Sequence, residues 1–131
     1  MELCACGSQN AYTNCCHKYI SQQENPLTAE QLMRSRYVAY VKCEIEYILD
    51  TTHFSTRNQY NAASIEDWAR TSHWMGLQIV SCKQGLQSDD IGFVEFKAHY
   101  KDPNNISHVH HEYSSFKKEA NKWYFVKGEV F

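Results

Sequence analysis

Four cysteines lie within thirteen consecutive positions near the start of the chain, as Cys4-x-Cys6 and then, after eight residues, Cys15-Cys16. The residues around them are mostly Gly, Ser, Asn and Gln and show no apolar periodicity, so this segment cannot fold by burying a core of its own. Four thiolates complete the tetrahedral coordination that zinc favours, and metal binding then supplies the missing folding free energy. The spacing predicts one structural zinc ion, with iron as the alternative, bound by Cys4, Cys6, Cys15 and Cys16.

The same cysteines have two other interpretations. They are free thiols, or they form disulfides between near neighbours, which would be strained and out of place in a reducing cytosol. Within the metal hypothesis, His17 is an alternative to Cys16 as the fourth ligand, since imidazole nitrogen also binds zinc. Cys43 and Cys82 have no ligand-like neighbours in the sequence, and we expect both to be small buried hydrophobic side chains.

Composition limits the size of the fold and its partners. With 131 residues, 43% of them hydrophobic, the chain can build one ordinary domain and a small additional module. A formal charge of -2 provides no field that would draw it to nucleic acid or to a membrane surface. The N-terminus lacks a signal-peptide pattern, and no apolar run approaches the roughly 20 residues that span a bilayer. We therefore expect a soluble, cytoplasmic protein with no membrane partner.

The hydrophobic pattern changes from a helical to a strand period along the chain. Thr28 is placed to cap a helix over 29–42, which continues to residue 50 as one long helix or two adjacent ones. Ser64 is the predicted cap of a second helix that runs to Trp74 and ends at Gly76. Strands are predicted at 77–83, 91–100, 107–118 and 122–130, joined by short turns. This order predicts an α+β fold, a curved four-stranded antiparallel sheet wrapped around the N-terminal helices.

Two groups of motifs resemble known families. The run Cys4-Ala5-Cys6-Gly7-Ser8, with Tyr12 and Cys15-Cys16, resembles the SEC-C motif at the C-terminus of the SecA translocation ATPase, although Gln9-Asn10-Ala11 replaces its Gly-Lys-Lys. Segments along the rest of the chain resemble the YchJ family of bacterial proteins: 32–40, Trp68-Ala69-Arg70, Val94-Glu95-Phe96, and His111-Glu112 with Ser114 and Phe116. The resemblance implies a SEC-C knuckle over residues 1–22 and a cone-shaped domain similar to nuclear transport factor 2 over residues 23–131.

In cones of this type the open mouth of the sheet often holds a small-molecule pocket. The resemblance implies that residues of the shared motifs line it: Arg34, Arg36, Tyr40, Trp68, Arg70, Trp74, Glu95, His111 and Glu112. Aromatic walls with a few convergent charges suit a ligand, and Glu95, His111 or Glu112 is a candidate general acid or base. The alternative is structural: the aromatic residues fill the core, and Arg34 and Arg36 pair with carboxylates such as Glu112.

A second possible metal site lies in the third predicted strand. His108, His110 and Glu112 alternate along it, so their side chains share one face. Three such ligands can build a catalytic zinc site. The structural interpretation, which we favour, is that His108 belongs to the preceding turn and that His110 or His111 forms hydrogen bonds within a polar cavity.

Two functions are compatible with these features. The first is a non-enzymatic adaptor whose zinc knuckle contacts a protein or ribosome-associated partner. The second is an enzyme or small-ligand binder that uses the cavity of the cone. A deep cavity in which polar groups converge without satisfying one another favours the second, and a filled cone favours the first.

Overall fold

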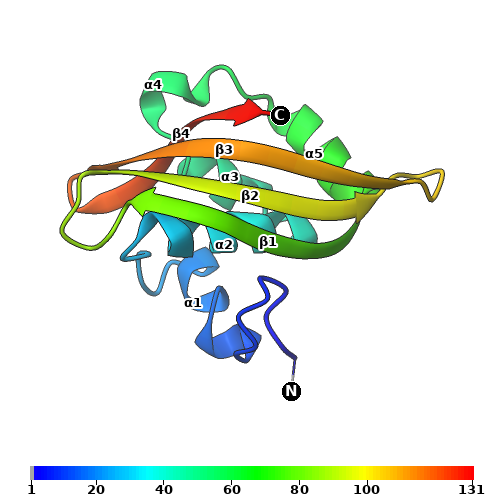
Figure 1. Ribbon diagram of the computed structural model, residues 1–131, viewed down its shortest axis with the longest axis horizontal. Coiled ribbons are helices and arrows are strands. Elements are labelled where there is room, and N and C mark those ends of the chain that lie inside the picture. Colours follow the sequence, from blue (N-terminus) through cyan, green and yellow to red (C-terminus); the bar gives the residue numbers. More distant parts are fainter. Residues whose placement is uncertain (1) are drawn as a thin grey trace.

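The first half of the chain is helical and the second half forms one sheet, in a computed structural model that describes residues 2–131 (Figure 1). The helices are η1 (Tyr12–Asn14), α1 (His17–Ile20), α2 (Ala29–Lys42), α3 (Ile45–Asp50), α4 (Phe54–Arg57) and α5 (Ala62–Thr71). The strands are β1 (His73–Gln84), β2 (Ile91–Lys101), β3 (Ser107–Glu119) and β4 (Lys122–Val130). The α+β fold and its four strands are thus confirmed. The short helices η1, α1 and α4 were not predicted.

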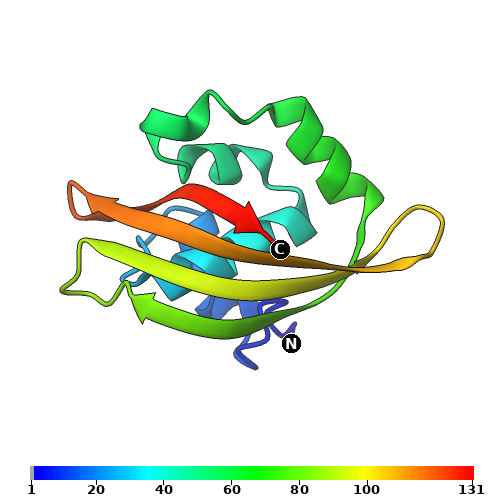
Figure 2. The same cartoon turned by 45° about the horizontal axis from the view of Figure 1, so that its top comes forward.

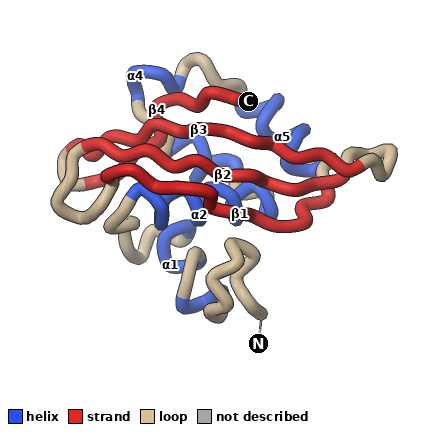
Figure 3. The backbone as a smooth tube through the Cα atoms, in the orientation of Figure 1, coloured by secondary structure: helices blue, strands red, loops and turns tan. Residues whose placement is uncertain are grey.

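The sheet is an antiparallel meander in the order β1-β2-β3-β4. Helices α2, α3 and α5 lie on its concave side, and among the described residues no helix covers the opposite face (Figure 2). Alternate residues of the inner face, such as Val94, Phe96 and Phe116, are buried against Leu32 and Ile48 of the helices. The curved sheet and the helices inside it therefore form the predicted cone (Figure 3).

Helix α2 begins where the sequence predicts and ends earlier than one long helix would. The hydroxyl of Thr28 accepts a hydrogen bond of 3.1 Å from the backbone N–H of Gln31, a standard N-cap. At the other end Cys43 takes a left-handed conformation with φ of 58°. This residue separates α2 from α3, so the apolar pattern over 29–50 is two adjacent helices.

The start and end of α5 differ from the sequence prediction. Its cap is Asn61, whose side chain accepts a 3.1 Å hydrogen bond from the backbone N–H of Ser64. Helix α5 ends at Thr71, and both Trp74 and Gly76 belong to β1, with a shift of register between them. The Trp74 ring still packs on Trp68 at 5.3 Å between centroids, which explains why its position fits a helical spacing. Gly76 marks a β-bulge, not a helix end.

The N-terminal segment packs against the helical layer. Cys4, Cys6, Cys16 and Tyr19 are buried in the same cluster of side chains as the core of the cone. Figures 1 and 3 show the segment at one end of the helices, beyond the edge strand β1. Its division from the cone at residue 22 stays a prediction.

No helix within residues 2–131 combines the length and apolar character needed to cross a bilayer.

Candidate functional site

The four predicted metal ligands converge in space. Their sulfur atoms all lie within 4.8 Å of one another, and the Sγ atoms of Cys6 and Cys15 are 3.7 Å apart. A tetrahedral zinc ion with bonds of about 2.3 Å requires sulfurs roughly 3.8 Å apart, whereas a disulfide bond measures about 2.05 Å. The cluster therefore fits a metal ion, and every cysteine in the described part of the chain is free of disulfides.

Local backbone structure brings these ligands together. A bridge between Leu3 and Ala11 closes a loop that carries the first two cysteines. Gly7 takes φ of +85° in this loop, a conformation that a side chain would strain. Cys15 follows η1, and Cys16 begins α1. The ligand group consists of cysteines only; His17 lies beside Tyr12, with ring centroids 5.2 Å apart.

Three of the four thiols are buried, and Cys15 is half-buried. A hydrogen bond with Cys16 lowers the pKa of Cys6 to about 4. The same hydrogen bond and burial raise the pKa of Cys16, while burial raises the pKa of Cys4. A bound divalent metal would displace the remaining protons, because thiolates are the metal-binding form.

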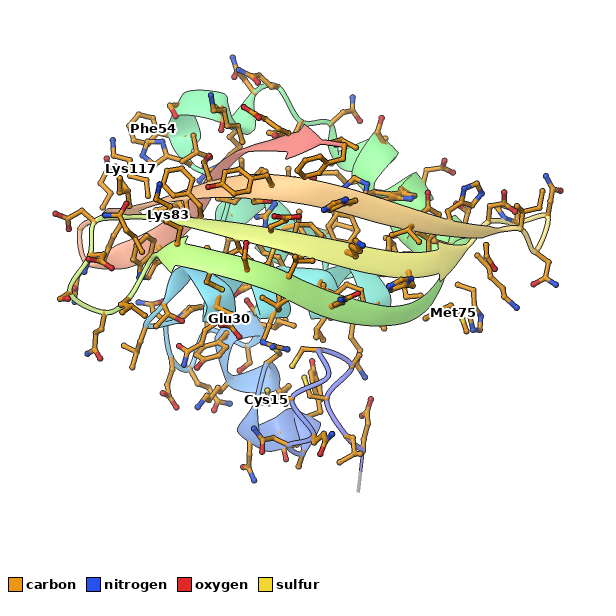
Figure 4. All side chains as sticks on the ribbon, viewed as in Figure 1. Cys15, Glu30, Phe54, Met75, Lys83 and Lys117 are labelled. Carbon is orange, nitrogen blue, oxygen red and sulfur yellow. The ribbon has the colours of Figure 1, made fainter. Side chains whose placement is uncertain are left out.

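Arg34 joins this cluster to the cone. Its Nη1 donates a 2.7 Å hydrogen bond to the carbonyl of Cys6, and its Nε donates one of 2.9 Å to Glu30, one turn back on α2. Figure 4 shows Glu30 on the side of the cone nearest the knuckle and Cys15 within the knuckle. Arg34 therefore belongs to the surroundings of the cysteine cluster and does not line the cavity.

A cavity of about 460 Å³ opens between the sheet and the helices of the cone. Its size is typical of small-molecule sites. Side chains from α2, α5 and the inner faces of β2 to β4 form most of its wall, and the wall residues are Met33, Arg36, Tyr37, Tyr40, Ile48, Gln59, Tyr60, Asn61, Ser64, Ile65, Trp68, Trp74, Phe96, Ala98, His110, Glu112, Phe125, Gly128 and Val130. Gln59, Asn61 and Ser64 are exposed, so the cavity opens to solvent beside the start of α5.

Arg36 is the buried cation of this wall, with 6% of its surface exposed. Its Nη1 donates to the carbonyl of Ile48 at 2.8 Å and to the hydroxyl of Thr51 at 2.7 Å. Its guanidinium carbon lies 4.4 Å from the ring centre of Phe125. Burial lowers the pKa of Arg36, an effect partly offset by Tyr40, Tyr47 and Glu112.

Glu112 is held by its neighbours on β3. Its Oε1 pairs with Nε2 of His110 at 2.8 Å, and its Oε2 accepts a short hydrogen bond from the hydroxyl of Ser114. Burial alone would raise the pKa of Glu112, but these two hydrogen bonds, together with the charges of His110 and Arg36, outweigh burial and lower the pKa below its usual value. Gly128 of β4 leaves the space for this carboxylate, because a Cβ atom there would collide with it.

The structure places five of the nine predicted pocket residues in the cavity wall: Arg36, Tyr40, Trp68, Trp74 and Glu112. The other four lie elsewhere. Arg70 is exposed on α5 and pairs with Glu66 at 2.8 Å. Glu95 and His111 pair with each other at 2.7 Å on the outer face of the sheet. Since neighbours in a strand point to opposite faces, His111 and Glu112 cannot both reach the cavity.

Strand alternation and helix spacing together identify wall residues that were not predicted. Phe96, Ala98 and His110 occupy inner-face positions of β2 and β3, and Met33 and Tyr37 share a helix face with Arg36 and Tyr40. Tyr60, Asn61 and Ser64 precede or begin α5, where no periodicity marks them.

One expectation about charged groups is corrected. Among the described residues no ion pair joins Arg34 or Arg36 to Glu112; Arg34 pairs with Glu30 instead, and Nη1 of Arg36 donates to backbone and hydroxyl oxygens.

The favoured interpretation of the histidines on β3 holds in part. His110 lines the cavity and forms a hydrogen bond with Glu112 there. His108 belongs to β3 and not to the preceding turn, although its Nε2 bonds to Asp102 of that turn at 2.8 Å.

The two cysteines outside the cluster also differ from expectation. Cys82 is exposed, and its Sγ donates to Glu30 at 3.4 Å. Cys43 is half-buried at the end of α2. Neither is a buried core side chain.

Comparison with known proteins agrees with this architecture. The model of the middle NTF2-like domain of YchJ matches residues 28–128. A UPF0225 protein of Geobacter sulfurreducens is 41% identical over 126 residues, covering 96% of this chain and 78% of that protein. A UPF0225 protein of Haemophilus influenzae is 40% identical over 130 residues, covering 99% of this chain and 79% of its own length.

Two solved structures are similar over the knuckle as well as the cone. The solution structure of a SEC-C motif containing protein from Rhodopseudomonas palustris aligns with a TM-score of 0.90 at 31% identity, covering 99% of both chains. The crystal structure of a SEC-C motif containing protein from Psychrobacter arcticus aligns with a TM-score of 0.83 at 31% identity, covering 100% of this chain and 84% of that one. With the cysteine cluster and the cone both matched, the chain belongs to the YchJ (UPF0225) family of SEC-C motif proteins.

Proposed function

We propose that this protein binds a small organic molecule in the cavity of its cone. The observation that carries the proposal is the cavity of about 460 Å³, in which aromatic walls surround the buried cation of Arg36. A buried charge facing empty volume is costly for folding and is typical of a site kept for a ligand.

Binding is a better description of this cavity than catalysis. Of the three candidate acid or base residues, only Glu112 lines it. Both oxygens of Glu112 already have partners, His110 and Ser114. A general acid or base needs an oxygen that is free to exchange a proton with its substrate. Both oxygens of this carboxylate are already hydrogen-bonded within the protein.

Tryptophan signals provide a direct test. Trp68 and Trp74 line the cavity, whereas the indole of Trp123 donates to the carbonyl of Leu27 at 3.1 Å, away from it. In a screen of small organic compounds by heteronuclear NMR, a ligand of the cavity should shift the first two indole signals and leave the third. Compounds that move none of the three, across a screen of several hundred, would contradict the proposal.

Blocking the entrance supplies a matched control. Ser64 is exposed and lines the cavity, while the neighbouring Ala63 is exposed and does not. Ser64→Trp should abolish the binding found in that screen, and Ala63→Trp should retain it. Both variants keep the Asn61 cap of α5, which uses only the backbone of residue 64.

For the cysteine cluster we propose one structural zinc ion per chain. Four thiolates favour zinc or an iron-sulfur cluster over harder ions, and zinc would serve here by fixing the fold of the knuckle. Elemental analysis of protein purified without chelator should give about one zinc per chain. Cys6→Ser with Cys16→Ser should lose it, whereas Cys82→Ser should not. Absence of metal, or an iron content instead, would overturn the assignment.

A second candidate function is contact between the knuckle and a protein or ribosome-associated partner. It is supported by the position of the knuckle at one end of the molecule (Figure 1) and by the 59% exposure of Leu3 on its surface. Leu3→Glu should then reduce co-sedimentation with ribosomes or recovery of a partner, at unchanged zinc content. Leu86→Glu, at an equally exposed leucine of the β1–β2 turn, is the control. Equal recovery with both variants would count against this role.

A further inference from the structure

We propose that the ligand of the cone carries a single carboxylate, which Arg36 binds at the buried end of the cavity. This inference rests on the proposed function and specifies its chemistry. The ligand class is a compact aromatic or branched aliphatic monocarboxylate.

The guanidinium of Arg36 has donors to spare. All of its hydrogen bonds within residues 2–131 come from Nη1, to Ile48, Thr51 and Thr52. Nε and Nη2 have no partner among these residues. Every side-chain nitrogen or oxygen without accessible surface in residues 2–131 has a hydrogen-bond partner. Nε and Nη2 of Arg36 have none, so they are not fully enclosed, and they face the open volume of the cavity. Nε and one Nη are the edge on which arginine holds a carboxylate with two parallel hydrogen bonds.

No carboxylate among residues 2–131 forms an ion pair with this edge. Glu112 is the acidic residue of the cavity wall, but its oxygens bind His110 and Ser114, and it acts on Arg36 only at longer range. Arg36 is also the one lysine or arginine in the wall formed by residues 2–131. Glu112 repels any anion in the cavity, so a monocarboxylate, with one negative charge, meets less repulsion there than a phosphate monoester with nearly two.

The rest of the cavity determines the body of the ligand. Trp68, Trp74 and Phe96 present apolar faces, and the hydroxyls of Tyr40 and Tyr60 have no hydrogen-bond partner among the described residues. These hydroxyls can donate to a carboxylate held by Arg36. At about 30 Å³ per water molecule, the cavity has room for on the order of fifteen waters, and a ligand has a similar number of non-hydrogen atoms.

The first test uses the unmodified protein and three matched probes: 3-phenylpropanoate, 3-phenylpropanamide and phenyl phosphate, titrated by NMR at pH 7. We expect the acid to bind at least about tenfold more tightly than the amide, which is the discrimination that one or two charge-assisted hydrogen bonds give. Binding of the amide as tightly as the acid would overturn the carboxylate inference and leave the proposed function standing. Preference for the phosphate would also overturn it. If no probe shifts Trp68 and Trp74, larger branched and bicyclic acid and amide pairs are titrated, and failure of every pair overturns both proposals.

The second test removes the cation. Arg36→Gln should reduce the affinity for 3-phenylpropanoate at least about tenfold and bring it to that of the amide. Arg70→Gln, which removes the same charge from the exposed surface of α5, should leave it unchanged. Retention of acid binding in a folded Arg36→Gln protein would refute the assignment. If that variant does not fold, Tyr40→Phe and Tyr60→Phe, which remove the other donors, are used instead. Each should reduce the affinity for the acid more than the affinity for the amide. Equal losses of affinity for acid and amide would refute the assignment.

Discussion

A structural role and a ligand-binding role of Glu112 predict opposite effects of its replacement on stability. Its side chain is 14% exposed, and its carboxylate accepts hydrogen bonds from His110 and Ser114. Replacement by Gln keeps the shape and removes the charge on which both hydrogen bonds depend. We expect Glu112→Gln to lower the free energy of unfolding at pH 7 by about 1–3 kcal/mol. Thermal and urea unfolding would measure it, with exposed Glu129→Gln as control.

The same residue predicts a pH dependence. The pKa of Glu112 is lowered in the folded protein, so the unfolded state binds its proton first as the pH falls. The stability that Glu112 contributes is therefore present above its unfolded pKa, near 4.3, and is lost as the pH drops through the lower folded value. The difference between wild type and Glu112→Gln should shrink below about pH 4. A difference that grows on acidification would contradict the lowered pKa of Glu112. A variant as stable as wild type at pH 7 would show that Glu112 has no structural role and would leave ligand binding as its function.

Arg34 makes a separate prediction for the metal site. A zinc ion bound by the four thiolates would carry a net charge of about -2, and the guanidinium of Arg34 lies beside the cysteine cluster, where it donates to the carbonyl of Cys6. Arg34→Gln should weaken zinc retention by roughly 10-fold or more, as for other groups that orient metal ligands. Competition with a zinc-binding dye would measure this. Arg70→Gln removes an equivalent pair with a glutamate four residues back and should have no effect.

At the scale of elements, the sequence predicted what depends on local patterns. The helix at 29–42 and the four strands follow from a cap at Thr28 and from period-two alternation. The cysteine site was equally accessible, because its four ligands lie close together in the chain. The exact extent of α5 was not, since both Asn61 and Ser64 are residue types that cap helices, and the extended backbone of Ser72 that ends α5 follows no change in the apolar pattern.

To predict which residues line the cavity, the face of each strand position must be known as well as the sequence motif. Glu95 and His111 share motifs with residues of the wall, yet the pleat directs them to the outer face. Arg34 and Arg36 look equivalent in sequence, and only the packing of α2 shows that they serve different sites. Such assignments depend on long-range geometry, which a motif does not encode.

For the whole molecule, we predict that the cone folds without the knuckle. The apolar residues of the cone lie after Thr28 and bury one another. Deletion of residues 1–22 should leave a cooperative thermal transition, at a lower temperature because Cys4, Cys6, Cys16 and Tyr19 no longer cover the helical layer. Circular dichroism and calorimetry would follow it. A shortened chain without a cooperative transition would show that knuckle and cone are one folding unit.

Arg34 and Arg36 stand two positions apart on α2, and residues at this spacing point to different sides of a helix. One donates to the carbonyl of Cys6 in the cysteine cluster, and the other faces the cavity. Helix α2 thus carries both contacts, and any axial shift or rotation of α2 changes both of them. If metal binding and ligand binding favour the same position of α2, thermodynamic reciprocity requires that metal and ligand increase each other's affinity by one common factor.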